Sequence, residues 1–224
     1  MLKIAISGTH GVGKTTLANR LIKTLSKQFN PKKELILVPE YIRSNLRKDI
    51  GEQQTEDATL FYITKAMSLL HIVDGTPSLK VAVFDRPWFD TAIYYLAAKA
   101  MKDRVTKAPK RRNLEDEIIS LFAKAQLAEA VAIYKHYDII IFNKLPVSKY
   151  DPQPENDGVR LQSVTFRNIV NDFFRSLYTP YLKQRSELLQ RTRIVTNANP
   201  LGCKCSVNAF MRNLVGNEIL PVIC

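Results

Sequence analysis

The chain has 224 residues, of which 46% are apolar, and a formal net charge of +12. The apolar fraction is ordinary for a packed globular protein, and no segment approaches the roughly 18 uninterrupted apolar residues of a membrane span. The three cysteines lack the spacing of a zinc site and cannot all pair with one another. We therefore expect a cytoplasmic protein with reduced thiols and no membrane partner.

Apolar runs that are typical of buried strands alternate with amphipathic helical patterns along the chain. This alternation predicts an α/β fold in which helices cover both faces of a parallel sheet. Strands are predicted at residues 2–6, 34–38, 80–84, 138–142 and 193–196, and helices at 14–28, 54–73, 89–101, 114–134 and 162–189, with Pro180 as a candidate break. We predict one domain over residues 1–197 with a lid loop at about 146–160. An appendix over 198–224 is predicted to pack on the same domain.

The first predicted strand leads directly into Gly8-Thr9-His10-Gly11-Val12-Gly13-Lys14-Thr15, which fits the phosphate-loop pattern G-x-x-x-x-G-K-[ST]. Glycines let successive backbone N–H groups point inward, and the following helix adds the positive end of its dipole. Lys14 is predicted to reach the β- and γ-phosphates of ATP, and Thr15 to bind Mg²⁺. A glycine-rich turn that binds nothing is the alternative. The predicted nucleotide-binding residues are Gly8, His10, Gly11, Val12, Gly13, Lys14, Thr15 and Thr16.

Charged side chains follow the next two predicted strands, and ligands of open parallel sheets bind beyond the carboxyl ends of strands. Asp85 is predicted to bind Mg²⁺ together with Thr15, with a helix N-cap as the alternative role. Arg86 is predicted to bind a phosphate or the acceptor, with a surface ion pair as the alternative. Glu40 is predicted to act as a general base or to orient the acceptor, with an ordinary exposed glutamate as the alternative.

The polar segment before the last long helix is predicted to close over the substrate. Arg160 would then neutralise charge that develops on the transferred group. Arg167, seven residues later on the same helix face, is a second candidate for this role. Plain turn chemistry around Asp157 and Gly158 is the alternative reading of the segment.

The stretch 99–112 is strongly basic and contains a single acid, Asp103. Such a stretch can hold the backbone of a polynucleotide, so DNA or RNA is a candidate partner, with a solvated loop as the alternative. Trp88, Tyr94 and Tyr95 lie nearby in the sequence, and they either stack on a base or belong to the core.

Taken together, these motifs resemble those of the P-loop kinases of nucleosides and nucleotides. The resemblance is carried by residues 8–16, by Pro39-Glu40-Tyr41-Ile42-Arg43, by Asp85-Arg86 and by Asp157-Gly158-Val159-Arg160. It is closest to the AAA-like ATPase and kinase group that includes the ribosylnicotinamide kinase domain. That group also includes phage enzymes that phosphorylate modified bases in DNA or free nucleotides.

The resemblance implies a P-loop NTPase three-layer sandwich with a five-stranded parallel sheet and a lid. It also implies that Glu40 touches the acceptor, that Asp85 and Arg86 serve the metal and the acceptor, and that Arg160 serves ATP. We therefore expect a phosphotransferase that uses ATP and Mg²⁺, and whose acceptor is a nucleoside, a nucleotide or a nucleic acid, with a hydroxyl group favoured. The predicted catalytic residues are Lys14, Glu40, Asp85, Arg86 and Arg160.

Two other functions are consistent with parts of the sequence. A nucleic-acid-associated P-loop ATPase without a small-molecule acceptor would explain the basic stretch. A GTPase-type switch is suggested by Asn143-Lys144 after the fourth predicted strand, but Pro146 stands where an acidic residue is wanted.

Overall fold

The computed structural model describes residues 1–40, 54–102, 111–125, 136–143, 164–183 and 193–197. Within these residues the chain forms one five-stranded sheet, in which all neighbouring strands are parallel. Its strands are β1 (Leu2–Ser7), β2 (Leu35–Val38), β3 (Val81–Phe84), β4 (Ile139–Asn143) and β5 (Arg193–Asn197). The spatial order is β2-β3-β1-β4-β5, so the strand that leads into the phosphate loop is the central one.

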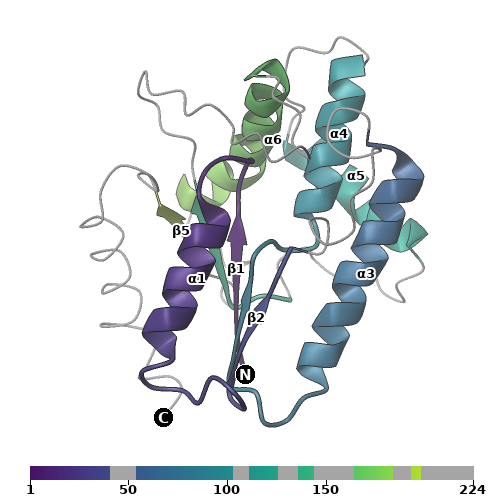
Figure 1. Ribbon diagram of the computed structural model, residues 1–224. Helices are drawn as coiled ribbons and strands as arrows, with labels where there is room; N and C mark the ends of the chain where they lie inside the picture. Colours follow the sequence, from purple (N-terminus) through teal and green to yellow (C-terminus); the bar gives the residue numbers. More distant parts are fainter. Residues whose placement is uncertain (41–53, 103–110, 126–135, 144–163, 184–192, 198–224) are drawn as a thin grey trace.

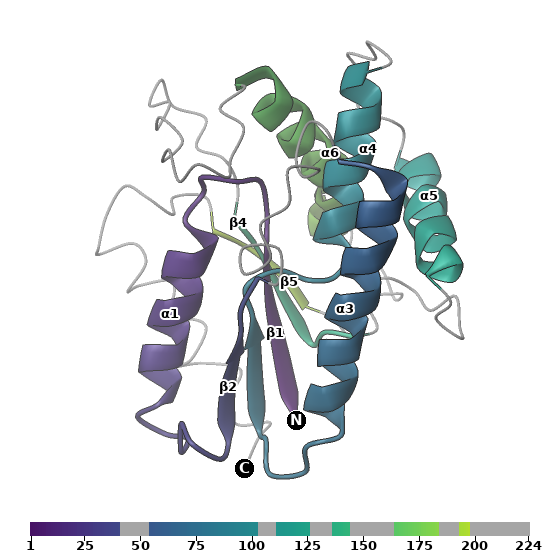
Figure 2. The same ribbon diagram turned by 45° about the vertical axis from the view of Figure 1, so that its right-hand side comes forward.

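Helices cover both faces of this sheet (Figures 1 and 2). On one face α1 (Lys14–Leu25) buries Leu17, Leu21 and Leu25 against β-strand residues such as Ile4 and Ile6. The other face carries α3 (Glu56–Asp74), α4 (Asp90–Lys102), α5 (Arg111–Lys124) and α6 (Val164–Lys183), which enclose the larger core cluster. The predicted three-layer α/β sandwich with a five-stranded parallel sheet is therefore confirmed.

The described strands agree closely with the predicted ones, because no strand begins or ends more than one residue from its predicted position. The starts of α1 and α4 also lie within one residue of their predicted positions. The described helix α6 runs through Pro180, so the candidate break is absent there, and residues 184–189 of the predicted helix lie outside the described residues. Helix α5 begins at Arg111, three residues before its predicted start. The lid loop at about 146–160 and the appendix over 198–224 lie outside the described residues. None of the described helices is long and apolar enough to cross a bilayer.

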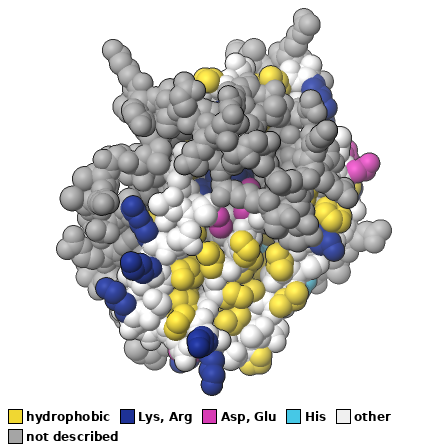
Figure 3. Space-filling model, in the orientation of Figure 1, with side chains coloured by type: hydrophobic (Ala, Val, Ile, Leu, Met, Phe, Trp, Pro, Cys, Tyr) yellow, Lys and Arg dark blue, Asp and Glu magenta, His cyan; other side chains and the backbone are white. Residues whose placement is uncertain are grey.

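The strands all point the same way, so the residues that follow them gather at one edge of the sheet. Seen from the side of Figure 1, acidic and basic side chains meet in a small area at this edge, and hydrophobic side chains gather below it between α1 and α3 (Figure 3). The predicted site residues that follow β1, β2 and β3 belong to this edge.

Candidate active site

The phosphate loop joins the central strand β1 to α1. Three of its glycines have positive φ angles, with values of 136° at Gly8, 76° at Gly11 and 79° at Gly13. Gly13 is also the N-cap of α1, and no side chain caps the helix there. The first turn of α1 contains no acidic residue. The first N–H groups of the helix are therefore not taken by a side-chain cap, which is the arrangement that binds an anion.

Asn143 holds the loop from the neighbouring strand β4. Its amide nitrogen Nδ2 donates to the backbone oxygen of Val12 over 3.1 Å, and the whole residue is buried. The backbone oxygen of Asn143 also lies 2.5 Å from the point where a Cβ atom of Gly8 would stand. The side chain that suggested a guanine-reading element in the sequence is therefore a support of the phosphate loop.

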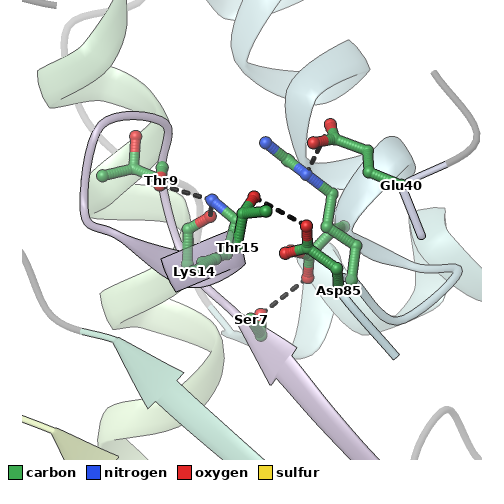
Figure 4. A network of polar contacts seen from close by, with 9 residues as sticks. Ser7, Thr9, Lys14, Thr15, Glu40 and Asp85 are labelled. Atoms are coloured by element: carbon green, nitrogen blue, oxygen red, sulfur yellow. Dashed lines mark hydrogen bonds and ion pairs between the residues drawn. The ribbon is translucent and has the colours of Figure 1, made fainter. Parts of the chain in front are cut away.

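Lys14 lies inside the loop with its side chain buried. Its Nζ atom donates to the backbone oxygens of Gly8 and Thr9 over 2.8 and 2.6 Å (Figure 4). Burial and the positive charge of Arg86 lower the pKa of Lys14, while three nearby carboxylates oppose this shift. The ammonium group thus lies within the backbone cradle in which a phosphate chain would bind.

Thr15 and Asp85 meet across the gap between α1 and β3. The Thr15 hydroxyl donates to Asp85 Oδ2 over 2.7 Å (Figure 4). Burial raises the pKa of Asp85, although this hydrogen bond and the positive charge of Lys14 act in the opposite direction. The two residues that were predicted to bind the metal therefore lie in direct contact.

Glu40 and Arg86 form a buried ion pair beside this cluster, with Arg86 Nε 2.6 Å from Glu40 Oε1. Their side chains are 7% and 11% exposed, so the pair is not the surface ion pair that the sequence left open for Arg86. The guanidinium also lies over the Tyr94 ring, with Cζ 4.8 Å from the ring centroid. Burial by itself lowers the pKa of Arg86, but Glu40 and Tyr94 more than offset this and raise it.

A pocket opens next to this ion pair, between the ends of β2 and β3 and the helices α3 and α4. About 440 Å³ of empty space, open to solvent on one side, belongs to it. Aromatic and aliphatic side chains form most of its wall, together with Glu40 and Arg86. The lining residues are Val38, Pro39, Glu40, Tyr62, Ala66, Leu69, Phe84, Arg86, Pro87, Trp88, Thr91 and Tyr137. A mostly apolar wall with a few polar groups is typical of a site for a small ligand.

His10 stands at a variable position of the phosphate-loop pattern. It is buried, with its ring against the rings of Tyr94 and Phe166 at centroid distances of 6.1 and 6.3 Å. Burial, together with the positive charge of Lys14, lowers the pKa of His10 to about 3, so the ring is neutral near pH 7. Its predicted nucleotide contact stays a prediction, as does that of the exposed Thr16.

The structure describes only some of the remaining predicted residues. Arg160 lies outside the described residues, whereas Arg167 is buried in the first turn of α6, where its backbone oxygen lies 3.5 Å from the Thr9 hydroxyl. Of the basic stretch 99–112, residues 103–110 also lie outside the described part. Trp88 and Tyr94 are buried, which agrees with the core role that the sequence left open.

Sequence reasoning missed a buried polar network below the loop. It consists of Ser7 at the end of β1, Asp90 at the start of α4 and Tyr178 on α6. No motif links these residues, and 83 and 171 positions of sequence separate Ser7 from the other two. Only the folded structure brings them together.

Comparison with solved structures gives matches over nearly the whole chain. Deoxyadenosine kinase from M. mycoides, solved with the products dCMP and dCDP, has a TM-score of 0.62 at 16% identity, covering 97% of this chain and 100% of that one. The same enzyme with dATP has a TM-score of 0.60 at 16% identity, covering 96% and 99%. Thymidylate kinase from Ehrlichia chaffeensis has a TM-score of 0.55 at 15% identity and covers 96% of each chain. At these identities the likeness shows the fold.

Sequence comparison places the chain in a family. No protein of curated function matches the sequence significantly. The sequence model of the AAA domain family, by contrast, matches residues 3–188, which is most of the chain and includes every described element except Leu2 at the start of β1 and the whole of β5. The chain therefore belongs to the AAA domain family and has the fold of the P-loop nucleoside and nucleotide kinases.

Proposed function

We propose that the protein is a P-loop kinase that transfers the γ-phosphoryl group of ATP to a hydroxyl group of a nucleoside. The observation that carries this proposal is the buried ion pair between Glu40 and Arg86, which lines a pocket and directly follows Asp85, the partner of Thr15. It joins a carboxylate that can accept a proton to a guanidinium that can hold an acceptor. The neighbours named deoxyadenosine kinase and thymidylate kinase support transfer to a nucleoside or nucleotide in general terms.

The charge of the pocket favours a nucleoside over a monophosphate as the acceptor. Among the described residues that line the pocket, Glu40 and Arg86 are the charged ones, and they neutralise each other. A phosphate monoester carries about −1.5 to −2 charges near pH 7 and would need further cations. A neutral ligand with a planar base suits the aromatic wall formed by Tyr62, Phe84 and Trp88.

In the proposed reaction the acceptor oxygen forms a bond to the γ-phosphorus of ATP. The bond between that phosphorus and the oxygen bridging to the β-phosphate breaks, and ADP leaves. The hydroxyl proton passes to the carboxylate of Glu40, which Arg86 holds in place. Lys14 and the amides of the phosphate loop hold the negative charge of the phosphate chain.

The chemistry at Thr15 and Asp85 fits a magnesium ion. Both side chains offer oxygen ligands, and Asp85 Oδ1 is buried with no hydrogen-bond partner among the described residues. When bound, the ion would neutralise charge on the phosphate chain. Arg160 remains the predicted lid residue. Arg167, the second candidate for that role, is buried in the structure.

Radiolabelled ATP offered with a panel of acceptors tests the proposal. The panel contains nucleosides, their monophosphates, nicotinamide riboside, and single- and double-stranded oligonucleotides. We expect label on a nucleoside, with Lys14→Ala as the inactive control. Glu40→Gln should lower kcat for the hydroxyl acceptor by about 10²–10⁴, because the amide cannot accept the proton.

The matched control is Glu56→Gln, since Glu56 is a glutamate whose ion pair with Lys124 lies at the surface. This variant should keep wild-type turnover. Label on monophosphates alone would remove the base role of Glu40. ATP hydrolysis that DNA or RNA stimulates without any labelled acceptor would instead support the nucleic-acid-associated ATPase.

A further inference from the structure

Asp90 is a carboxylate buried beneath the phosphate loop, and the reaction proposed above does not use it. It stands at the start of α4, five residues after Asp85, and its exposed fraction is 0%. Burial raises its pKa, although the positive charges of Arg86 and Lys14 and the hydrogen bond from Ser7 act in the opposite direction. Burying an acidic group costs several kcal/mol unless its partners are well placed. The contacts of Asp90 therefore indicate what it does.

Those contacts lead to the two residues at which the chain enters the phosphate loop. The Ser7 hydroxyl donates to Asp90 Oδ1 over 2.6 Å, and the Asp90 carboxylate also lies near the backbone N–H of Gly8. Tyr178 on α6 donates its own hydroxyl to Ser7 Oγ over 2.8 Å. Ser7 and Tyr178 are both completely buried. One chain of hydrogen bonds thus runs from α4 through the end of β1 to α6.

The position of Gly8 matters for the whole loop. Its backbone oxygen accepts a hydrogen bond from Lys14, and its Cα packs closely against the backbone of Asn143. A small rotation at Gly8 would therefore change both the lysine contact and the direction of the loop amides. Phosphate binding depends on those amides being oriented before the ligand arrives.

We propose that Asp90 is a positioning residue that fixes Ser7 and Gly8 and thereby orients the amide cradle for the phosphates of the nucleotide. Asp90 touches neither nucleotide nor acceptor in this role. The inference rests on the proposed function only in requiring that the loop binds a nucleotide. It adds that α4, the helix whose start also borders the acceptor pocket, holds the nucleotide site in shape.

Asp90→Asn is a suitable probe because it keeps the shape of the side chain. A carboxylate presents an acceptor oxygen on both sides, whereas an amide presents one oxygen and one NH₂ group. Ser7 already accepts a hydrogen bond from Tyr178, so its own proton needs an acceptor. In the variant the NH₂ group faces either the Ser7 O–H or the space near the Gly8 N–H that the second carboxylate oxygen occupies, and the entry to the loop shifts.

Calorimetric titration with ATP and Mg²⁺, in the absence of any acceptor, measures the effect. We expect Kd for ATP to rise about tenfold or more in Asp90→Asn, because the contact that fixes the entry to the loop is disturbed. In steady-state kinetics KM for ATP should rise in parallel, while KM for the acceptor stays within about twofold. If Asp90 only stabilised the fold, its substitution would lower the unfolding temperature without raising KM for ATP more than KM for the acceptor.

Asp138→Asn is the matched control. Asp138 Oδ2 accepts a hydrogen bond of 2.7 Å from the backbone N–H of Lys3, so this carboxylate serves the opposite end of the same strand β1. The control should bind ATP as the wild type does. Wild-type affinity in Asp90→Asn, or an equal loss in both variants, would overturn the inference. Failure of the wild-type protein to bind ATP would instead overturn the proposed function.

Ser7→Ala provides an independent second variant, because it removes the same hydrogen bond with a smaller change. If Asp90→Asn does not fold, as judged by circular dichroism, Ser7→Ala alone carries the test and should weaken ATP binding severalfold. If both fold, the double variant should bind ATP no more weakly than the weaker single variant, because the two residues act through one contact. Independent, multiplying losses would contradict the inference.

Discussion

Arg86 takes part in several contacts of the site. It pairs with Glu40, lies over the ring of Tyr94 and lines the pocket. Its φ angle of 154° is the one positive value among described residues other than glycine. Such backbone strain persists where the surrounding contacts hold it, and it is commonest at functional sites. The strained backbone at Arg86 is consistent with a precise position of its guanidinium beside the acceptor.

A pH-dependent stability is expected from Asp90. In the unfolded chain its carboxyl group has its ordinary pKa of 3.8, whereas burial raises the pKa in the folded protein. Above pH 4 the unfolded chain has released this proton while the folded protein still holds it. The contribution of Asp90 to stability is therefore fully present below pH 4 and is lost as pH rises through the folded-state pKa.

Urea unfolding of the wild type and Asp90→Asn between pH 4.5 and 7.5 measures this contribution. The wild type should lose more free energy of unfolding than the variant as the pH rises, because the amide has no proton to release. All other titrating groups are common to both proteins and cancel in the difference. Parallel stability curves would show that Asp90 ionises as an exposed carboxylate does.

At the scale of single elements, the phosphate loop makes different demands on its glycines. A Cβ at Gly8 would stand 2.5 Å from a backbone oxygen, whereas a Cβ at Gly11 would meet nothing within 4 Å. Both residues have positive φ angles, so both resist a side chain. Steric contact with the backbone adds to this resistance at Gly8 alone.

The two alanine variants should therefore differ in stability. Gly11→Ala should lower the free energy of unfolding by about 1–2 kcal/mol, the usual penalty of a side chain at such a φ angle. Gly8→Ala should lower it by clearly more, because Asn143 has to move as well. Urea denaturation of both variants under one set of conditions decides this. Equal losses would mean that the loop relaxes without moving β4.

The elements themselves were predictable because each depends on local patterns. Apolar runs located the five strands, and the phosphate-loop motif located the start of α1 at Lys14. Glu40, Asp85 and Arg86 could be predicted to lie together because they follow strands whose ends share one edge of a sheet. The run of α6 through Pro180 was not predictable, since proline only disfavours a helix and the packing of the remaining helix against the core prevails.

Other parts of the site depend on contacts between distant segments. Asp90 looks like any acid near a helix start, and Tyr178 looks like a core aromatic residue. Asn143 suggested a guanine-reading element in the sequence, but its amide holds Val12 instead. These roles follow from tertiary packing, which a pattern along one chain does not contain.

For the whole molecule, the sheet order explains how the parts of the site come together. β1 is central, so the phosphate loop has β3 on one side and β4 on the other. The neighbour on one side supplies Asp85 and Arg86, and the neighbour on the other supplies Asn143. A nucleotide bound at this point would touch elements from most of the sheet, so its binding should stabilise the entire fold.

Thermal unfolding measures this stabilisation. A ligand at 100 times its Kd adds about 2.7 kcal/mol to the free energy of unfolding. ATP should therefore raise the unfolding temperature, and Mg²⁺ should raise it further. Asp85→Asn should keep the effect of ATP alone and lose the increment due to Mg²⁺, because it removes a charged oxygen ligand. Chelation with EDTA should reduce the wild type to the behaviour of this variant.

Lys80→Ala serves as the control in this experiment. Lys80 forms an exposed ion pair with Glu34 at the far end of the sheet, and it should not affect the response to either ligand. An unchanged Mg²⁺ increment in Asp85→Asn would remove this residue from the predicted metal site.

The short segment from Asp85 to Asp90 combines several duties, and this has a consequence for protein engineering. Within six positions it contributes a predicted metal ligand, the partner of Glu40, two further pocket walls and the support of Ser7. Randomising it to change acceptor preference would damage several of these at once. Libraries aimed at new acceptors should instead vary Ala66 and Leu69, which border the pocket from α3 and carry none of the other duties.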